Sequence, residues 1–291
     1  PYLKMFDIKK KLIFSGIIAI AIFSFPKASN AFIPYLYYPN KKTLKNTATN
    51  FAKTAAQLIH FGQTKQAIQV AELSVTLNPK DYRLWSVLAE AQLKENLLKE
   101  ANLSLEKAKE LNPDNAQIWF IQGSIALQQK QSKEAIYLIQ KGLALEPNSH
   151  SALFQLGNAR LIQFNHKLAL KAFEKATEIK PNFWEALNNQ GLVLFEIGKK
   201  KKAIKTWRKV LTITENAEPM LALAAALNKT TNYKEEAIKL AIDALAKNPN
   251  YVLSSYQEDQ LWGYEIQKAT KALFQSPELI DAVERAIANS E

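Results

Sequence analysis

The sequence predicts an all-α solenoid built from stacked helical hairpins. Helix-forming residues dominate the composition, and no stretch alternates apolar and polar residues with the period of two expected of a half-buried strand. Proline recurs every 34 residues, at Pro79, Pro113, Pro147 and Pro181. Alanine keeps the same spacing at six successive positions, Ala67, Ala101, Ala135, Ala169, Ala203 and Ala237. A fixed period of this length indicates that one supersecondary unit is repeated along the chain.

Each repeat is expected to contain two antiparallel helices. If the recurring alanine is assigned to position 20, the six repeats occupy 48–81, 82–115, 116–149, 150–183, 184–217 and 218–251. Position 8 is also small in every repeat: Ala55, Ala89, Gly123, Gly157, Gly191 and Ala225. Small residues at both positions allow two helix backbones to approach closely, and a proline near position 32 ends the second helix. Because one hairpin cannot bury its apolar face alone, neighbouring repeats are expected to stack into a continuous core.

The fourth repeat carries the clearest local pattern. It contains, in order, Leu156, Gly157, Ala169, Phe173, Ala176 and Pro181. This spacing resembles the W-x2-L-G-x2-Y…A-x3-F…P pattern of the tetratricopeptide-repeat (TPR) family, and the resemblance covers 48–251. The chain departs from the pattern at Gln122 and Gln190, where leucine is usual, and at Glu215, which replaces the fifth proline. The resemblance implies a right-handed TPR superhelix of about six repeats, in which first helices line a concave surface.

The chain beyond the repeats is predicted to form a C-terminal helical cap over 252–291. The repeat phase is lost there, because Asp259 and Lys271 stand at positions 8 and 20 of what would be a seventh repeat. An apolar helical stripe continues nonetheless, and Ser276-Pro277 is typical of a helix N-terminus. On the other side of the repeats, 32–47 has no periodicity and is predicted to be an extended N-terminal arm.

The first residues have the pattern of an export signal. Three lysines at 9–11 precede an apolar run over 12–25, which is followed by Pro26 and by small residues at Ser29 and Ala31. This order is typical of a signal peptide, here 1–31, with cleavage after Ala31. The alternative is an uncleaved N-terminal membrane anchor, although the apolar run is shorter than the roughly 20 residues of a spanning helix.

Motifs for catalysis and for metal or cofactor binding are missing from the sequence. The chain has no cysteine, which excludes disulfides, thiolate catalysis and zinc–thiolate sites. Its histidines, His60, His150 and His166, stand at unrelated repeat positions without a second ligand at suitable spacing. Nucleotide-binding, hydrolase and metalloprotease motifs are also absent. The sequence therefore predicts no catalytic residue, no cofactor, no metal and no enzyme activity.

The TPR resemblance implies which side chains face the concave surface. The candidate residues of this peptide groove are Arg83, Glu90, Phe120, Ser124, Phe154, Asn158, Asn188, Asn189 and Phe195. Asn158 and Asn189 resemble asparagines that hold a peptide backbone in chaperone-binding members, and Phe120 and Phe154 would offer apolar surface beside them. Phe154 also replaces a lysine of the dicarboxylate clamp in those members, so an acidic C-terminal tail is not the predicted ligand. The alternative is that the asparagines are ordinary polar surface.

Positive charge is concentrated in the fifth repeat. The chain has a net charge of +11, and its densest basic patch consists of Lys199, Lys200, Lys201, Lys202, Lys205 and Arg208. The patch is either a solvated turn or a docking surface for an acidic protein or a lipid surface, which would allow peripheral membrane contact. Nucleic acid is not a predicted partner, because no aromatic residues are interleaved for base stacking.

Together these features predict a non-catalytic scaffold that binds one or more proteins through its concave groove. The order of signal, TPR array and 256–262 in the cap is similar to exported TPR proteins of cyanobacteria and the chloroplast thylakoid lumen. That resemblance implies an assembly factor for photosynthetic membrane complexes in the thylakoid lumen or periplasm. The alternatives are a periplasmic protein that organises the envelope and an accessory subunit of an enzyme encoded elsewhere. The oligomeric state stays open.

Overall fold

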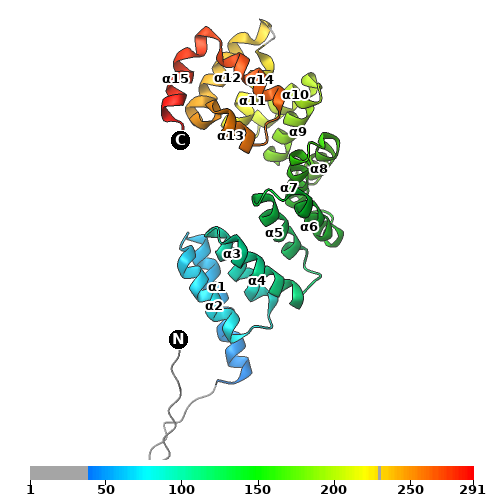
Figure 1. Ribbon diagram of the computed structural model, residues 1–291, viewed down its shortest axis with the longest axis vertical. Helices are drawn as coiled ribbons and strands as arrows, with labels where there is room; N and C mark the ends of the chain where they lie inside the picture. The colour runs from blue at the N-terminus through cyan, green and yellow to red at the C-terminus, as the bar shows by residue number, and fades with distance from the viewer. Residues whose placement is uncertain (1–38, 229–230) are drawn as a thin grey trace, which may run out of the picture. The chain divides into compact units, whose positions relative to one another are not determined.

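Six helical hairpins follow one another along the chain in the computed structural model, which describes residues 39–228 and 231–291 (Figure 1). Within the described residues no β-strand occurs, and the all-α solenoid predicted from the sequence is confirmed. The hairpins pair α1 (Lys41–His60) with α2 (Thr64–Leu77), α3 (Tyr82–Lys94) with α4 (Leu98–Leu111), α5 (Ala116–Gln128) with α6 (Ser132–Leu145), α7 (His150–Ile162) with α8 (His166–Ile179), α9 (Trp184–Glu196) with α10 (Lys200–Leu211), and α11 (Ala217–Leu227) with α12 (Lys234–Lys247).

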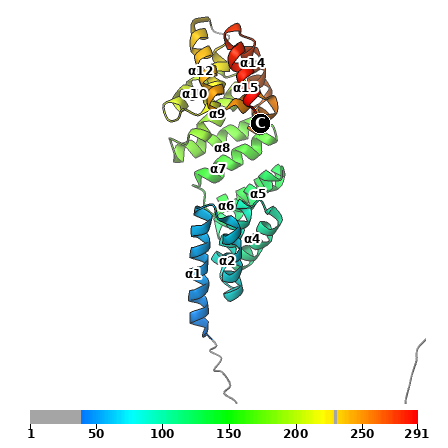
Figure 2. The ribbon, with the colours of Figure 1, turned by 90° about the vertical axis from the view of Figure 1, so that its left-hand side faces the viewer.

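The start of the chain divides from the rest at Asn40, since 1–40 and 41–291 form separate units. The predicted signal peptide and residues 32–38 of the predicted arm lie outside the described residues. The end of that arm, 41–47, is helical rather than extended and forms the first turns of α1, which therefore reaches beyond α2 (Figure 2). Its sequence, KKTLKNT, contains no helix breaker after Pro39, so helix formation continues upstream of the first repeat. None of the described helices is long and apolar enough to cross a membrane.

A left-handed backbone residue closes the turn inside most hairpins. Position 15 has a positive φ in five successive repeats, at Gly62, Asn96, Lys130, Phe164 and Gly198. Glycine and asparagine adopt this conformation readily, whereas a bulky side chain adopts it at a cost. The bulky Phe164 is nonetheless held there, and its side chain is 83% exposed.

The alanine column lies in the core as predicted. All six alanines at position 20 are completely buried, and so are the position-8 alanines Ala55 and Ala89. In the third, fourth and fifth repeats position 24 carries Ile139, Phe173 and Trp207, and position 8 is glycine. A Cβ added to Gly157 would lie 2.3 Å from Phe173 Cε1, and one added to Gly191 would lie 2.5 Å from Trp207 Cε2. Close contact of the two helices in a repeat therefore depends on matching a small residue to a large one.

The C-terminal cap is helical, as predicted, but it contains more segments than one helix pair. It comprises η2 (Pro249–Val252), α13 (Ser254–Asp259), α14 (Tyr264–Phe274), η3 (Pro277–Leu279) and α15 (Ile280–Asn289). Helix α14 packs against α11 and α9, while α15 packs against α12 (Figure 1). Trp262, Ile266 and Leu273 of the predicted apolar stripe are buried in these contacts. The cap thus covers the first helices of the last two repeats.

Candidate functional site

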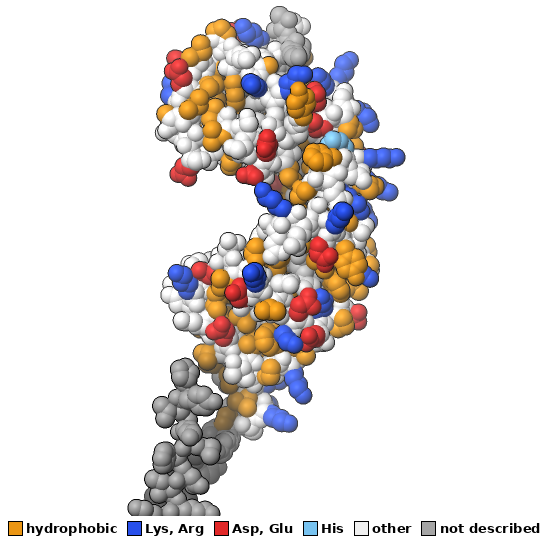
Figure 3. Space-filling model, in the orientation of Figure 1, with side chains coloured by type: hydrophobic (Ala, Val, Ile, Leu, Met, Phe, Trp, Pro, Cys, Tyr) orange, Lys and Arg blue, Asp and Glu red, His pale blue; other side chains and the backbone are white. Residues whose placement is uncertain are grey.

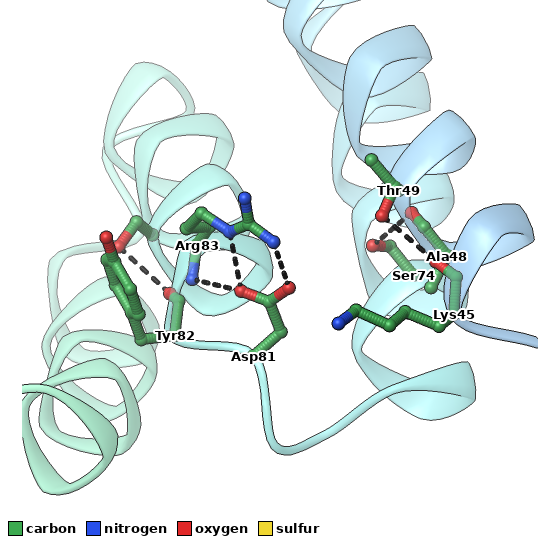
Figure 4. Close-up of polar contacts among 8 residues, drawn as sticks. Lys45, Ala48, Thr49, Ser74, Asp81, Tyr82 and Arg83 are labelled. Atoms are coloured by element: carbon green, nitrogen blue, oxygen red, sulfur yellow. Dashed lines mark hydrogen bonds and ion pairs between the residues drawn. The ribbon is translucent and has the colours of Figure 1, made fainter. Parts of the chain in front are cut away.

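The predicted groove residues of the second and third repeats remain at the surface, with one exception. Arg83 and Glu90 on α3 are exposed, and Ser124 on α5 is half-buried. Arg83 already has a partner, because its Nε and Nη2 donate to Asp81 Oδ1 and Oδ2 over 2.9 and 2.6 Å (Figure 4). This pairing lowers the pKa of Asp81 and raises that of Arg83. Since the Arg83 side chain is 61% exposed, the ion pair contributes little to stability.

The exception is Phe120, which belongs to the core. Its side chain is 4% exposed, and a Cβ on Gly142 would lie 2.4 Å from Phe120 Cε1. Phe154 is half-buried and packs its ring against Phe173 and Phe183, with centroid separations of 5.8 and 5.2 Å. The prediction that Phe120 offers apolar surface to a ligand is therefore wrong, and Phe154 offers only part of its ring. Position 5 fills space between helices here rather than facing solvent.

The candidate asparagines form a chain of hydrogen bonds. Asn189 Nδ2 donates to Asn158 Oδ1 over 2.9 Å, which joins the fifth repeat to the fourth. Asn188 Nδ2 donates to Asn189 Oδ1 over 3.3 Å, and Trp207 Nε1 donates to Asn188 Oδ1 over 3.1 Å. Asn188 is 1% exposed and Asn189 is also buried, whereas Asn158 is half-buried. Of the three asparagines, only Asn158 remains accessible to a ligand.

The cap explains why the groove is closed over the fifth repeat. Glu196, at the end of α9, accepts hydrogen bonds from the backbone N–H groups of Glu265 and Ile266 over 3.2 and 3.0 Å. A carboxylate in this place satisfies free N–H groups at the start of α14. Phe195 is buried beside Trp207, at 6.0 Å between ring centroids. The prediction that Asn188, Asn189 and Phe195 line an open groove is thus corrected, because α14 covers this part of the concave face.

A carboxylate that the sequence analysis did not single out ties the cap to the sixth repeat. Trp262 Nε1 donates to Glu218 Oε1 over 3.0 Å, and polar groups of Asn188 and Tyr251 also face this carboxylate. Burial raises the pKa of Glu218 above its ordinary value. It also raises the pKa of Tyr251, with a further contribution from the nearby Glu218. The one available signal was an acidic residue at the start of the apolar stretch AEPMLALAAAL.

Next to this cluster lies a cavity of 640 Å³. Its volume falls within the range of about 300–1,000 Å³ that is typical of ligand sites. Three successive repeats and the cap contribute its apolar walls, formed by Leu127, Leu161, Ile162, Leu192, Val193 and Trp262. Its rim carries Lys130, Phe164, His166, Glu258, Asp259 and Tyr264. The space-filling view shows the surface hollowed between α5 and the cap, with acidic and basic side chains around the hollow (Figure 3). Sequence analysis missed this cavity, because its walls come from segments distant along the chain.

The predicted basic patch lies at the surface. Its five lysines are exposed in the turn before α10 and along that helix, and α10 contains no acidic residue. Arg208 is held in a two-pronged ion pair with Glu236, at 2.7 and 2.8 Å. Lys200 Nζ lies 5.2 Å from the centre of the Phe195 ring. Among the described residues, no ion pair engages the five lysines, so their charge is available to a partner.

Within the parts of the chain that the structure describes, no three His, Asp or Glu side chains lie close enough together to hold a metal ion. Near the cavity, Glu196 is engaged with the backbone of α14, and Asn188 with Asn189. The arrangement is suited to holding a ligand by surface complementarity.

Comparison with known proteins identifies the repeats. Family models described as tetratricopeptide repeat match residues 58–125, 150–183 and 185–216. PilF of Pseudomonas aeruginosa is 19% identical, with a TM-score of 0.65 over 75% of this chain and 98% of PilF. MamA is 25% identical, with a TM-score of 0.51 over 54% of this chain and 92% of MamA. YrrB, described as a TPR protein with an unusual peptide-binding site, is 21% identical, with a TM-score of 0.52 over 65% of this chain and 97% of YrrB.

Comparison with curated proteins gives no match. The similarity to these solved structures, at low sequence identity, establishes a shared fold. The matched repeats, the buried alanine column and the paired helices agree with this fold. Proteins built on this fold generally act as non-catalytic scaffolds that bind other proteins. The chain thus contains tetratricopeptide repeats, which the family models match over 58–125, 150–183 and 185–216.

Proposed function

We propose that this protein is a non-catalytic scaffold that binds a polypeptide segment on the concave side of its repeats. The observation that carries the proposal is the open cavity of 640 Å³, whose apolar walls come from three successive repeats and the cap. Half-buried apolar walls gain stability when a ligand covers them. Binding of a peptide by YrrB, which has the same fold, supports the assignment.

The binding surface runs from the second repeat to the cap. Exposed polar groups on α3, half-buried ones on α5 and the amide of Asn158 on α7 precede the cavity, while α14 covers the repeats that follow. A segment lying along this path would meet polar groups first and an apolar cavity at its end. Contacts of this extent typically give micromolar dissociation constants, about −8 kcal/mol of binding free energy.

Photo-crosslinking from the cavity rim tests the proposal. A photoreactive phenylalanine analogue replaces Phe164, which is 83% exposed on the rim, or Leu103, which is 68% exposed on the second helix of a repeat and serves as the matched control. We expect discrete protein adducts from position 164 and none of them from position 103. Equal capture from both positions, or no adduct from position 164 in the native cells, would show that the rim does not bind a protein.

We further propose that the protein is exported and assists assembly of photosynthetic membrane complexes in the thylakoid lumen or periplasm. The N-terminal pattern of lysines, apolar run and small residues supports export, and the similarity to lumenal TPR proteins supports the process. Sequencing the N-terminus of the protein from its native cells tests cleavage after Ala31. Identification of adducts from position 164 tests the process: photosystem subunits support it, whereas wall synthases, outer-membrane assembly proteins or a stoichiometric enzyme would assign one of the alternatives.

The exposed lysines of α10 favour a second contact. Because no acidic residue lies on this helix, we propose that the basic patch adds an electrostatic contact with an anionic lipid surface. Sedimentation with anionic vesicles at low salt is expected to decrease when Lys201, Lys202 and Lys205 are replaced by glutamine. Equal sedimentation of the triple variant would contradict the contact.

A further inference from the structure

We infer that the cavity bounded by repeats three to five and the cap selects a segment in which basic residues directly adjoin an apolar anchor residue. This inference rests on the proposed function and names the chemistry of the bound segment. It is built from the walls of the cavity, from the charges on its rim and from the rigidity of its cap side.

The walls of the cavity favour an apolar anchor residue in the bound segment. Leu127 and Leu161 stand at position 12 of successive repeats, and each is only half-buried, as is the adjacent Ile162. On the opposite side the buried ring of Trp262 closes the cavity. The volume of 640 Å³ lies within the range of protein ligand sites. An aromatic or branched aliphatic side chain inserted into the cavity would remove Leu127, Leu161 and Ile162 from water.

The rim charges call for basic residues next to the anchor. The cavity lining includes three carboxylates and a single lysine, Lys130, although the chain as a whole has a net charge of +11. One of the carboxylates, Glu196, already binds the N-terminus of α14. Glu258 and Asp259 are exposed and form no ion pair with any of the described residues. These two free carboxylates, at the end of α13, can receive a cationic side chain that emerges from the apolar cavity.

The cap side of the cavity is held in place before any ligand arrives. Trp262 is fixed by the hydrogen bond to Glu218 and by the Tyr251 ring, at 5.7 Å between ring centroids. Its backbone N–H donates to the Gln257 carbonyl over 3.0 Å, which closes the turn that carries both free carboxylates. A preformed site loses less conformational entropy on binding and so favours one ligand chemistry over another.

Binding of labelled peptides to the full chain tests the inference. Fluorescence anisotropy compares three peptides: one with a Leu-Phe anchor followed by two lysines, its twin with two glutamates in place of the lysines, and its twin with two serines in place of the anchor. We expect both twins to bind at least about tenfold more weakly than the basic peptide. Equal or tighter binding of the glutamate twin would overturn the proposed charge preference, and equal binding of the serine twin would overturn the apolar anchor.

Charge reversal locates the effect on the rim. The variant Glu258→Lys with Asp259→Lys is expected to bind the basic peptide about tenfold more weakly and the glutamate twin more tightly. The control is Glu174→Lys with Glu178→Lys, which reverses two exposed charges on α8 away from the cavity and is expected to change neither affinity by more than about twofold. Thermal unfolding of both variants checks that they fold. Unchanged affinities in the rim variant would overturn the inference.

The peptide and crosslinking experiments fail in different ways. If position 164 captures proteins but the basic peptide does not bind, the scaffold function stands and the proposed segment chemistry is wrong. If position 164 captures nothing and no peptide binds, both proposals are wrong.

Discussion

The fourth and fifth repeats have the same hairpin architecture, yet they present different surfaces. In the fourth repeat Asn158 is half-buried and accessible on the concave side, whereas in the fifth Asn188 and Asn189 are buried. The difference arises outside the repeats, because α14 packs against α9 and α11 and so covers the fifth repeat. A repeat position therefore determines the direction of a side chain, while the elements packed over it determine whether a ligand can reach it.

The cores of the two repeats differ as well. Position 24 is Phe173 in the fourth repeat and Trp207 in the fifth, and both are completely buried. An indole has an N–H that needs an acceptor when it is buried, and Asn188 supplies one. The larger ring of the fifth repeat thus requires a buried amide, which is linked through Asn189 to the fourth repeat.

The largest effect is expected from Trp207→Ala, which removes the largest completely buried side chain of the fifth repeat. It should lower the free energy of unfolding by about 3–5 kcal/mol through the cavity that it leaves. Urea unfolding followed by circular dichroism measures the change. Trp207→Phe is the control: it keeps most of the ring but leaves Asn188 Oδ1 without its donor, and should cost about 1–3 kcal/mol. If Trp207→Ala lowers the free energy of unfolding by less than about 1 kcal/mol, the ring does not support the repeat.

A smaller effect is expected where glycine contacts the large ring. On helix propensity alone, Gly157→Ala and Gly191→Ala would each stabilise by about 0.5–1 kcal/mol. Because the added Cβ would lie 2.3 Å from Phe173 and 2.5 Å from Trp207, both should instead destabilise, by about 1–3 kcal/mol. Thermal unfolding gives the sign directly. Gly198→Asn is the control. A Cβ added at Gly198 would have no atom within 4 Å, and Asn96 already adopts the same left-handed conformation at the equivalent position. Stabilisation at both test sites would contradict the predicted steric overlap.

How much the sequence predicts depends on whether a feature is repeated. The alanine column and the small residues at position 8 could be predicted from the sequence, because every repeat packs its two helices together at the same positions. Left-handed position 15 also left a signal, with glycine or asparagine in three of its five occurrences. The cap is not part of the repeat pattern, so its residues have no equivalent positions elsewhere in the chain. Its apolar stripe predicted a helix but could not indicate that α14 would dock on α9 and α11.

The candidate site was less predictable for the same reason. Phe120 was assigned to the groove from its repeat position, but Gly142 on α6 left a space that the ring fills. Glu218 and Trp262 are 44 residues apart, and only the folded cap brings them within hydrogen-bond distance. The docking of the cap on the last repeats buries the amides of Asn188 and Asn189, and it also forms one wall of the cavity. Site residues next to an element that is not repeated could therefore not be placed from position alone.

A pH-dependent effect is expected at the junction between the cap and the sixth repeat. Burial raises the pKa of Glu218 above 4.5, so the folded state holds this proton more tightly than the unfolded state does. The stability that Glu218 contributes is therefore complete below pH 4.5 and is lost as pH rises through the folded-state pKa. Asp81 and Glu106 have lowered pKa values and act in the opposite direction, losing stability as pH falls.

The variant Glu218→Gln isolates this contribution, because the amide can still accept from Trp262 but does not titrate. Urea midpoints are measured from about pH 4 to about pH 8 for both proteins. We expect the stability of the variant, relative to the original chain, to increase as pH rises. Asp81→Asn should change the relative stability with the opposite slope, and its profile is extended down to about pH 2 because the pKa of Asp81 is lowered from 3.8. Parallel pH profiles for the original chain and Glu218→Gln would mean that the carboxylate titrates normally in the folded state.

The smallest effect on stability is expected from the amide link between the two repeats. Asn158→Ala and Asn189→Ala each remove the 2.9 Å hydrogen bond, and a double-mutant cycle should give a coupling energy of about 0.5–1.5 kcal/mol with helicity unchanged. Because Asn158 is accessible whereas Asn189 is not, Asn158→Ala should also reduce protein capture from position 164, and Asn189→Ala should reduce it less. Unchanged capture in the double variant would mean that the asparagines only join the fourth repeat to the fifth. If both single variants instead lose capture equally, ligand binding depends on the hydrogen-bonded pair of Asn158 and Asn189. The buried Asn189 would then matter for binding as much as the accessible Asn158.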